Sequence, residues 1–185
     1  MVVDTETYSN RADKSPHGYR RHQLLLIHLA METLYNTLMA PEEESRSIRW
    51  IVLHCSATKP SQDFTLEKLR YQHVTVNGWS DIGYHYYVRR DGTIHKCRPE
   101  TQPGAHVRNF NRHSIGVCYE GGLDENGQPQ DTRTAEQLIS LHNLLSELLV
   151  RYPGAEIVGH RDLLAFRTKA CPCFDARRYY RYLRR

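Results

Sequence analysis

The sequence predicts an α/β fold in which a central mixed β-sheet is flanked by helices. Short apolar, β-branched runs at 49–55, 114–119 and 155–160 are typical of buried strands. A long amphipathic helical pattern at 134–152 lies between two of them. A further pair of strand-like runs is joined by a tight-turn dipeptide, which adds an antiparallel pair to the sheet.

The first two predicted elements of the domain are a strand and the helix that follows it. RWIVLHC (49–55) is apolar and ends in a loop rich in Ser, Thr, Lys and Pro, so it predicts a buried strand. A helix should follow over about 65–75. Asp63 or Thr65 would cap it, because a short polar side chain can accept a hydrogen bond from the first backbone N–H groups of a helix.

The middle of the chain predicts three strands. GYHYYVRRDGTIHKC (83–97) reads as two strands joined at Asp91-Gly92, a dipeptide that supplies the positive φ angles of a tight hairpin. SIGVCYEGG (114–122) is apolar and predicts a central strand. The polar run LDENGQPQD that comes after it indicates a surface loop.

The clearest helix lies at 134–152. Thr134 and Gln137 have the spacing of a capping box. The helix presents one apolar face, made of Leu138, Leu141, Leu145, Leu148, Leu149 and Tyr152. AEIVGH (155–160) then predicts a strand, and DARRYYRYLRR (175–185) a final basic helix whose arginines form a solvated face or an attachment site for anionic wall polymer.

Residues 1–45 differ in character from the single domain expected at 46–185. We expect this leader to be helical over about 22–39 or partly disordered. An Arg pair before the apolar run resembles a secretory signal, but a 21-residue segment precedes that run and His28 interrupts it. A third hypothesis is that translation starts at Met31.

Composition restricts the class of protein. With 39% hydrophobic and 25% charged residues, the chain is too apolar for a disordered tail and too mixed for a fibrous repeat. No apolar run approaches the roughly 20 residues that span a bilayer. The formal charge of +4 mildly favours anionic partners. Five cysteines without regular spacing argue against a disulfide scaffold and favour a reducing compartment or a metal-bound thiolate.

Three side chains at the ends of predicted elements suggest a metal site. His54 ends the first strand, His160 ends the last, and Cys171 lies on the loop that leaves it. Catalytic zinc needs three such ligands and one open position, which convergence at one sheet edge would supply. The alternative is a buried histidine bonded to a carbonyl and a cysteine that packs as a small hydrophobe. Because the chain has no HExxH or paired CxxC motif, spacing alone leaves both open.

Five segments in one order add a family resemblance: HCSATKPS, GWSDIGYHYYVRRDGTI, GAHVRNFNRHSIGVCYEGG, GHRDL and KACPCFD. They resemble the zinc-dependent N-acetylmuramoyl-L-alanine amidases of the type 2 family, which includes phage lysozymes that are amidases and the animal peptidoglycan recognition proteins. The likeness covers about residues 48–180. It implies an amidase/peptidoglycan recognition protein-like fold. It also implies zinc-dependent hydrolysis of the amide bond between N-acetylmuramic acid and L-alanine in peptidoglycan or muropeptides.

The resemblance also implies roles for individual residues. The zinc (Zn2+) ligands would be His54, His160 and Cys171. The catalytic residues would be Tyr84 and Lys169, whose hydroxyl and ammonium groups would hold the oxyanion of a tetrahedral intermediate. The domain at 46–185 would then be the zinc amidase domain.

The sequence departs from the family pattern at two cysteines. Cys173 offers a second thiolate two residues from the expected ligand Cys171. Cys118 stands where cytosolic recycling amidases of the family have a catalytic glutamate, and Glu120 is a weak substitute for that residue. We therefore expect the mechanism that uses Tyr84 and Lys169.

Further polar residues lie where the family lines its substrate groove. We expect His106, Asn111 and Ser114 to bind substrate, with loop capping as the alternative. If the strand is regular, His85 should point to the sheet face opposite Tyr84 and be structural, because successive side chains alternate along a strand. No metal contact is expected for the remaining histidines of the domain, His73, His95, His113 and His142.

The leading hypothesis is therefore an endolysin-like, lysozyme-like amidase that degrades cell wall. The alternative is a non-catalytic peptidoglycan-binding module, which the retained Cys171 disfavours. We expect a monomer with a peptidoglycan or muropeptide substrate, no nucleic acid and no membrane partner. We expect it to stay in the cytoplasm until it is released to the cell wall, and export is left open.

Overall fold

The computed structural model describes residues 25–31, 46–164 and 169–183. Residues 25–31 are helical and expose their apolar side chains, in agreement with that part of the helix expected at 22–39. The other predictions for the leader lie outside the described residues. Among the described helices, none is both long and apolar enough to cross a membrane.

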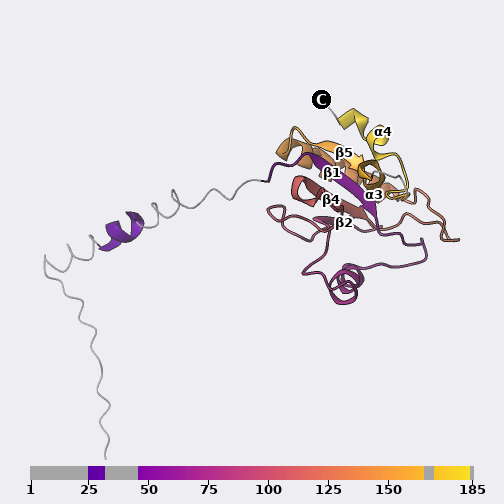
Figure 1. The fold of residues 1–185 in the computed structure, drawn as a ribbon, viewed down its shortest axis with the longest axis horizontal. Coiled ribbons are helices and arrows are strands. Elements are labelled where there is room, and N and C mark those ends of the chain that lie inside the picture. Colours follow the sequence, from indigo (N-terminus) through magenta and orange to yellow (C-terminus); the bar gives the residue numbers. More distant parts are fainter. Residues whose placement is uncertain (1–24, 32–45, 165–168, 184–185) are drawn as a thin grey trace, which may run out of the picture. The chain divides into compact units, whose positions relative to one another are not determined.

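One five-stranded mixed sheet organises the described part of the domain (Figure 1). Its order is β3-β2-β4-β1-β5, with strands β1 (Trp50–Cys55), β2 (Tyr86–Val88), β3 (Ile94–Lys96), β4 (Ser114–Tyr119) and β5 (Glu156–Gly159). Strand β1 runs parallel to β4 and β5, β2 runs parallel to β4, and β3 is antiparallel to β2. The mixed sheet predicted from the sequence is therefore confirmed.

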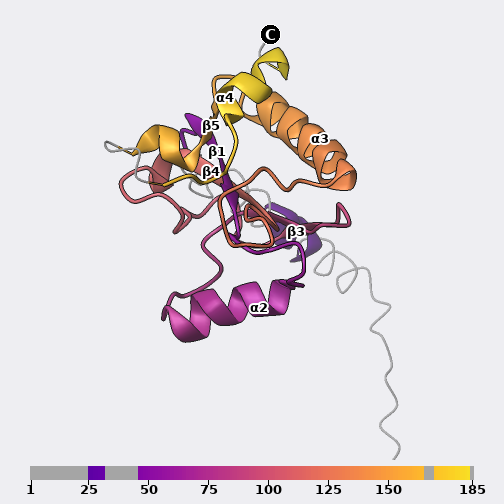
Figure 2. The same ribbon diagram turned by 90° about the vertical axis from the view of Figure 1, so that its right-hand side faces the viewer.

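Helices cover both faces of this sheet. Figure 2 shows α2 (Leu66–Arg70) and α3 (Ala135–Arg151) on opposite sides of the strands. Helix α2 continues as a π-helical segment over Tyr71–Val76, so the helix expected at 65–75 is present. The Thr65 hydroxyl caps α2, and α3 begins with the predicted capping box.

Alternation along β1 divides the core into two sides. Ile51, Leu53 and Cys55 are buried in one cluster with the apolar face of α3, to which Leu141, Leu144, Leu145 and Leu148 contribute. Val52 belongs to a separate cluster on the other face. His54 follows the same alternation, so its side chain projects from the face opposite α3.

Three local predictions need correction. In the hairpin only Gly92 has a positive φ, +85°, and the Arg89 N–H donates to the Thr93 carbonyl, so the connection is longer than a two-residue turn. Within the described residues the last segment is helical as α4 (Ala176–Tyr179) and a 3₁₀ turn at Arg181–Leu183, and the buried Tyr180 lies at the break between them.

The third correction concerns the end of β5. His160 does not end that strand but begins a 3₁₀ segment, His160–Leu163. The Asp162 carboxylate accepts a hydrogen bond from the Gly159 N–H at 2.8 Å and so caps the new turn. The chain turns as soon as β5 ends, which carries the His160 ring toward β1.

Candidate metal centre

Two histidines and one cysteine from distant parts of the chain meet beside the end of β1. The donor atoms of His54, His160 and Cys171 all lie within 4.8 Å of one another. His54 Nδ1 is 3.8 Å from Cys171 Sγ, and the His54 and His160 rings have centroids 4.6 Å apart. Among the described residues this is the one group of three or more such side chains, and two imidazoles with a thiolate are a donor set that zinc accepts.

Backbone contacts hold Cys171 against the sheet. The Cys55 N–H donates to Cys171 Sγ at 3.4 Å, and the Arg161 N–H donates to the Cys171 carbonyl at 3.0 Å. The Tyr119 hydroxyl donates to the Pro172 carbonyl at 2.6 Å. These donors come from β1, β4 and the turn after β5, so the loop is anchored to the two segments that carry the histidines and to β4 beside β1.

The electrostatics favour the protonation states that a metal requires. Burial lowers the pKa of His54 and brings that of His160 to about 4, and the nearby Lys169 charge acts in the same direction. A hydrogen bond from the Cys55 thiol is the largest cause of the lowered pKa of Cys171. Neutral imidazoles and an easily ionised thiol are the forms that bind a divalent cation.

The second thiol of this loop is placed differently. Cys173 Sγ lies 3.7 Å from Cys55 Sγ and is outside the three-residue group. Its hydrogen bond with Cys55 is the largest cause of a raised pKa, which disfavours the thiolate. All five cysteines are free in this structure.

The two expected catalytic residues lie near the group. The Tyr84 ring centroid is 5.1 Å from that of His54. Burial raises the pKa of Tyr84, so its hydroxyl keeps its proton and can donate a hydrogen bond. Lys169 is exposed, and its charge reaches both histidines. The position of both side chains is compatible with an oxyanion site, while their catalytic roles stay predictions.

The three residues expected to bind substrate have protein partners. His106 Nδ1 lies 3.0 Å from His54 Nε2, and His106 Nε2 lies 3.3 Å from Ser114 Oγ. Asn111 Oδ1 accepts from the backbone N–H groups of His106 and Val107, both at 2.9 Å. Loop capping, the alternative weighed for these residues, is thus present at Asn111, and substrate contact stays a prediction for all three.

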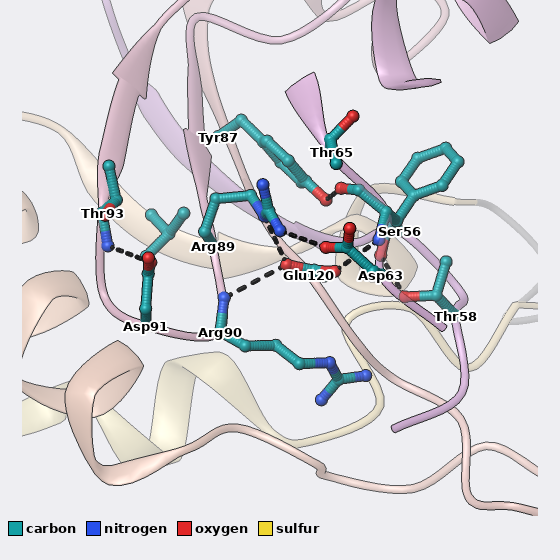
Figure 3. A network of polar contacts seen from close by, with 12 residues as sticks. Ser56, Thr58, Asp63, Thr65, Tyr87, Arg89, Arg90, Asp91, Thr93 and Glu120 are labelled. Atoms are coloured by element: carbon teal, nitrogen blue, oxygen red, sulfur yellow. Dashed lines mark hydrogen bonds and ion pairs between the residues drawn. The ribbon is translucent and has the colours of Figure 1, made fainter. Parts of the chain in front are cut away.

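Glu120 is the centre of a separate polar network (Figure 3). Its carboxylate is 1% exposed and accepts from the Phe64 N–H at 2.7 Å, Arg89 Nε at 2.7 Å and the Arg90 N–H at 3.2 Å. Arg89 also pairs with Asp63. Glu120 therefore ties the approach to α2 to the turn after β2. From the sequence, Glu120 was recognised only as the residue two positions after Cys118, and this network could not be predicted. Cys118 is itself fully buried.

The remaining histidines do not join the group. His85 Nδ1 accepts from the Gly116 N–H at 2.9 Å, a structural role as expected. The condition for opposite placement of His85 and Tyr84, a regular strand, is not met, because β2 begins only at Tyr86, and both rings have centroids within 6.4 Å of that of His106. His73 Nδ1 accepts from the Gly83 N–H at 3.1 Å.

Several known proteins are similar to this chain in sequence and in fold. Residues 44–174 match the family model of N-acetylmuramoyl-L-alanine amidases. The endolysins of Klebsiella phage KP32 and Escherichia phage T7 are each 42% identical over 130 residues, which cover 70% of this chain and 83% of each relative. The structure of the N-acetylmuramoyl-L-alanine amidase LysC from Clostridium intestinale aligns with a TM-score of 0.60 and 30% identity over 71% of this chain and 80% of that one. Drosophila PGRP-LB shares the fold, with a TM-score of 0.59 and 21% identity over 72% of this chain and 79% of that one.

Proposed function

Because the chain belongs to the N-acetylmuramoyl-L-alanine amidase family, we propose that it hydrolyses the amide bond between N-acetylmuramic acid and L-alanine in peptidoglycan or muropeptides. Zinc, held by His54, His160 and Cys171, is part of the proposal. The observation that carries it is the convergence of these three donor atoms within 4.8 Å. The endolysin relatives support cell-wall peptidoglycan as the substrate.

In the proposed reaction one set of residues binds zinc and another stabilises the oxyanion. Zinc, when bound, supplies Lewis acidity and makes a water molecule easier to ionise at neutral pH. The two imidazoles and one thiolate leave the site with a net positive charge, because the thiolate carries one negative charge and each histidine none. Tyr84 and Lys169 donate hydrogen bonds to the carbonyl oxygen as it becomes an oxyanion. Each of these two donors contributes on the order of a hundredfold in rate.

The relatives named endolysins also suggest where the protein acts. We propose that it reaches the cell wall after release from the cytoplasm and acts there as a monomer. The substrate is then its partner, and the mildly positive formal charge of +4 favours the anionic polymers of a wall.

Digestion of purified peptidoglycan tests the proposal. The protein is assayed as isolated, after chelation, and after zinc is restored, and mass spectrometry identifies the released ends. We expect stem peptides with free L-alanine amines, lost on chelation and regained with zinc. Cys171→Ala should remove both zinc and activity, and Cys173→Ala is the matched control because it removes a thiol two residues away that lies outside the ligand group.

The binding-module alternative has a distinct signature in the same experiment. A protein that binds zinc and muropeptide but releases no L-alanine amine would be a recognition module. That result would contradict the amidase proposal and the roles of Tyr84 and Lys169, while leaving the metal ligands intact.

A further inference from the structure

A line of hydrogen bonds runs from the candidate metal centre into the sheet. His54 Nδ1 faces Cys171, and the other ring nitrogen, Nε2, lies 3.0 Å from His106 Nδ1. The far nitrogen of His106 lies 3.3 Å from Ser114 Oγ. Ser114 Oγ in turn donates to the Phe110 carbonyl at 2.9 Å. Four groups from three parts of the chain are thus linked in series.

The donor and acceptor of each hydrogen bond can be assigned by starting from the bond between Ser114 and the Phe110 carbonyl. A carbonyl oxygen can only accept, so the single proton of the Ser114 hydroxyl points to Phe110. Ser114 Oγ can then only accept from His106, which places the His106 proton on Nε2. His106 Nδ1 is left with a lone pair and accepts from His54 Nε2. His54 therefore carries its proton on Nε2 and keeps a lone pair on Nδ1.

The end of this line agrees with an independent requirement. A histidine binds a metal through an unprotonated nitrogen, and its other nitrogen commonly donates to a second group that fixes the ring. In His54 the nitrogen that faces Cys171 is Nδ1, the one that the hydrogen bonds leave unprotonated. The hydrogen-bond directions, followed from the Phe110 carbonyl, and the requirement of metal binding thus give the same His54 tautomer, with the proton on Nε2.

The His106 ring is also fixed by packing. A Cβ atom built on Gly104 would lie 2.4 Å from His106 Cδ2, and one on Gly116 would lie 2.6 Å from the same atom. The ring is therefore held between two stretches of backbone that approach it closely only because they carry no side chain. Asn111 fixes the backbone of His106 from a third direction. His106 is 9% exposed and Ser114 is fully buried, so the hydrogen bonds between His54, His106 and Ser114 are shielded from water.

We propose that His106 and Ser114 form a relay that sets the tautomer and orientation of His54, so that Nδ1 is presented to the metal. His106 is then a positioning residue. The inference rests on the proposed function for the identity of the metal, and it extends that function from the three ligands to the residues that prepare one of them.

The tautomers are measured in the metal-free protein by long-range ¹H–¹⁵N correlation spectra of the histidine rings at neutral pH. We expect His54 and His106 both to show the pattern of a proton on Nε2. In Ser114→Ala, His106 loses its acceptor, and we expect its ring to lose that single pattern. A proton on Nδ1 of His54 in the wild-type chain would overturn the relay, whether or not the protein is an amidase.

Zinc affinity, measured by competition with a chelator, gives the second readout. Loss of an outer-shell partner costs about 10–100-fold in metal affinity. We expect that loss for His106→Leu and a smaller one for His106→Gln, whose amide oxygen can still accept from His54. The matched control is His73→Leu, which removes another buried histidine that makes no bond to a ligand and should leave zinc affinity unchanged.

The outcomes separate the two proposals. Wild-type zinc affinity in folded His106→Leu, with muropeptide binding lost, would show that His106 contacts substrate and would overturn the relay. If His106→Leu does not fold, the Ser114→Ala spectra decide, since unchanged tautomers in that variant would also overturn it. A wild-type protein that binds zinc but cuts no peptidoglycan would refute the proposed function and leave the relay standing.

Discussion

Replacing Glu120 by Gln should destabilise the protein without weakening its metal centre. The carboxylate accepts three hydrogen bonds with two oxygens, one bond on Oε1 and two on Oε2. An amide has one oxygen, so its NH₂ group must face either the Phe64 N–H or the Arg89 and Arg90 donors. One or two bonds to a charged group are lost, and each is worth about 1.5–3 kcal/mol.

The expected loss in the free energy of unfolding is therefore about 1.5–6 kcal/mol. With a urea dependence of about 1–3 kcal/mol per molar, the unfolding midpoint should fall by about 0.5 M or more. Urea titration of the wild type and of Glu120→Gln measures this shift. Zinc affinity of the folded variant should stay at the wild-type value, because the donors to Glu120 belong to Phe64, Arg89 and Arg90 and none of them is a member of the candidate metal group.

The control is Glu125→Gln, which changes an exposed carboxylate that accepts a hydrogen bond from Ser61 Oγ at 2.8 Å. A surface change of this kind should stay within about 0.5 kcal/mol of the wild type. If Glu120→Gln were equally silent in stability yet reduced peptidoglycan cleavage, the structural reading of Glu120 would be wrong and its role as a catalytic substitute would be revived.

Three further outcomes are expected. Tyr84→Phe, which removes only the hydroxyl, should lower the cleavage rate on the order of a hundredfold at unchanged zinc affinity, and a rate within a factor of a few of the wild type would remove Tyr84 from the oxyanion site. Gly116→Ala places a Cβ 2.6 Å from the His106 ring, so unfolding experiments should show a loss of about 1–3 kcal/mol together with weaker zinc binding; unchanged stability would mean that the ring can move. Burial lowers the pKa of His85 from 6.5 to about 4, so on acidification the unfolded chain binds its proton first and stability falls between those two pH values. Urea unfolding of the zinc-free protein at pH 7 and pH 5 should show this fall, reduced in His85→Asn, and an equal fall in both would assign it to other groups.

Local patterns in the sequence predicted most of the helices and strands, and the family resemblance supplied the candidate ligands. The apolar runs gave β1, β4 and β5, and the Thr134 and Gln137 pair marked the start of α3. These signals are local because a strand or a cap depends on residues a few positions apart. The family motifs placed His54, His160 and Cys171, which the structure brings together.

Only the tertiary structure decided which atoms of the site face one another. The register of β1 against β4 pairs Trp50 with Ser114 and His54 with Cys118, and the Ser114 hydroxyl lies 3.3 Å from His106 Nε2. Glu120 became a buried hub in the same way, through partners 30 and 31 residues before it. Such contacts depend on sheet register and on the path of loops across a face, so they join residues whose separation in sequence carries no periodic signal. The sequence by itself therefore determined most of the strands and helices and proposed the ligand types, and the packing of distant segments determined which nitrogen of His54 faces Cys171 and which faces His106.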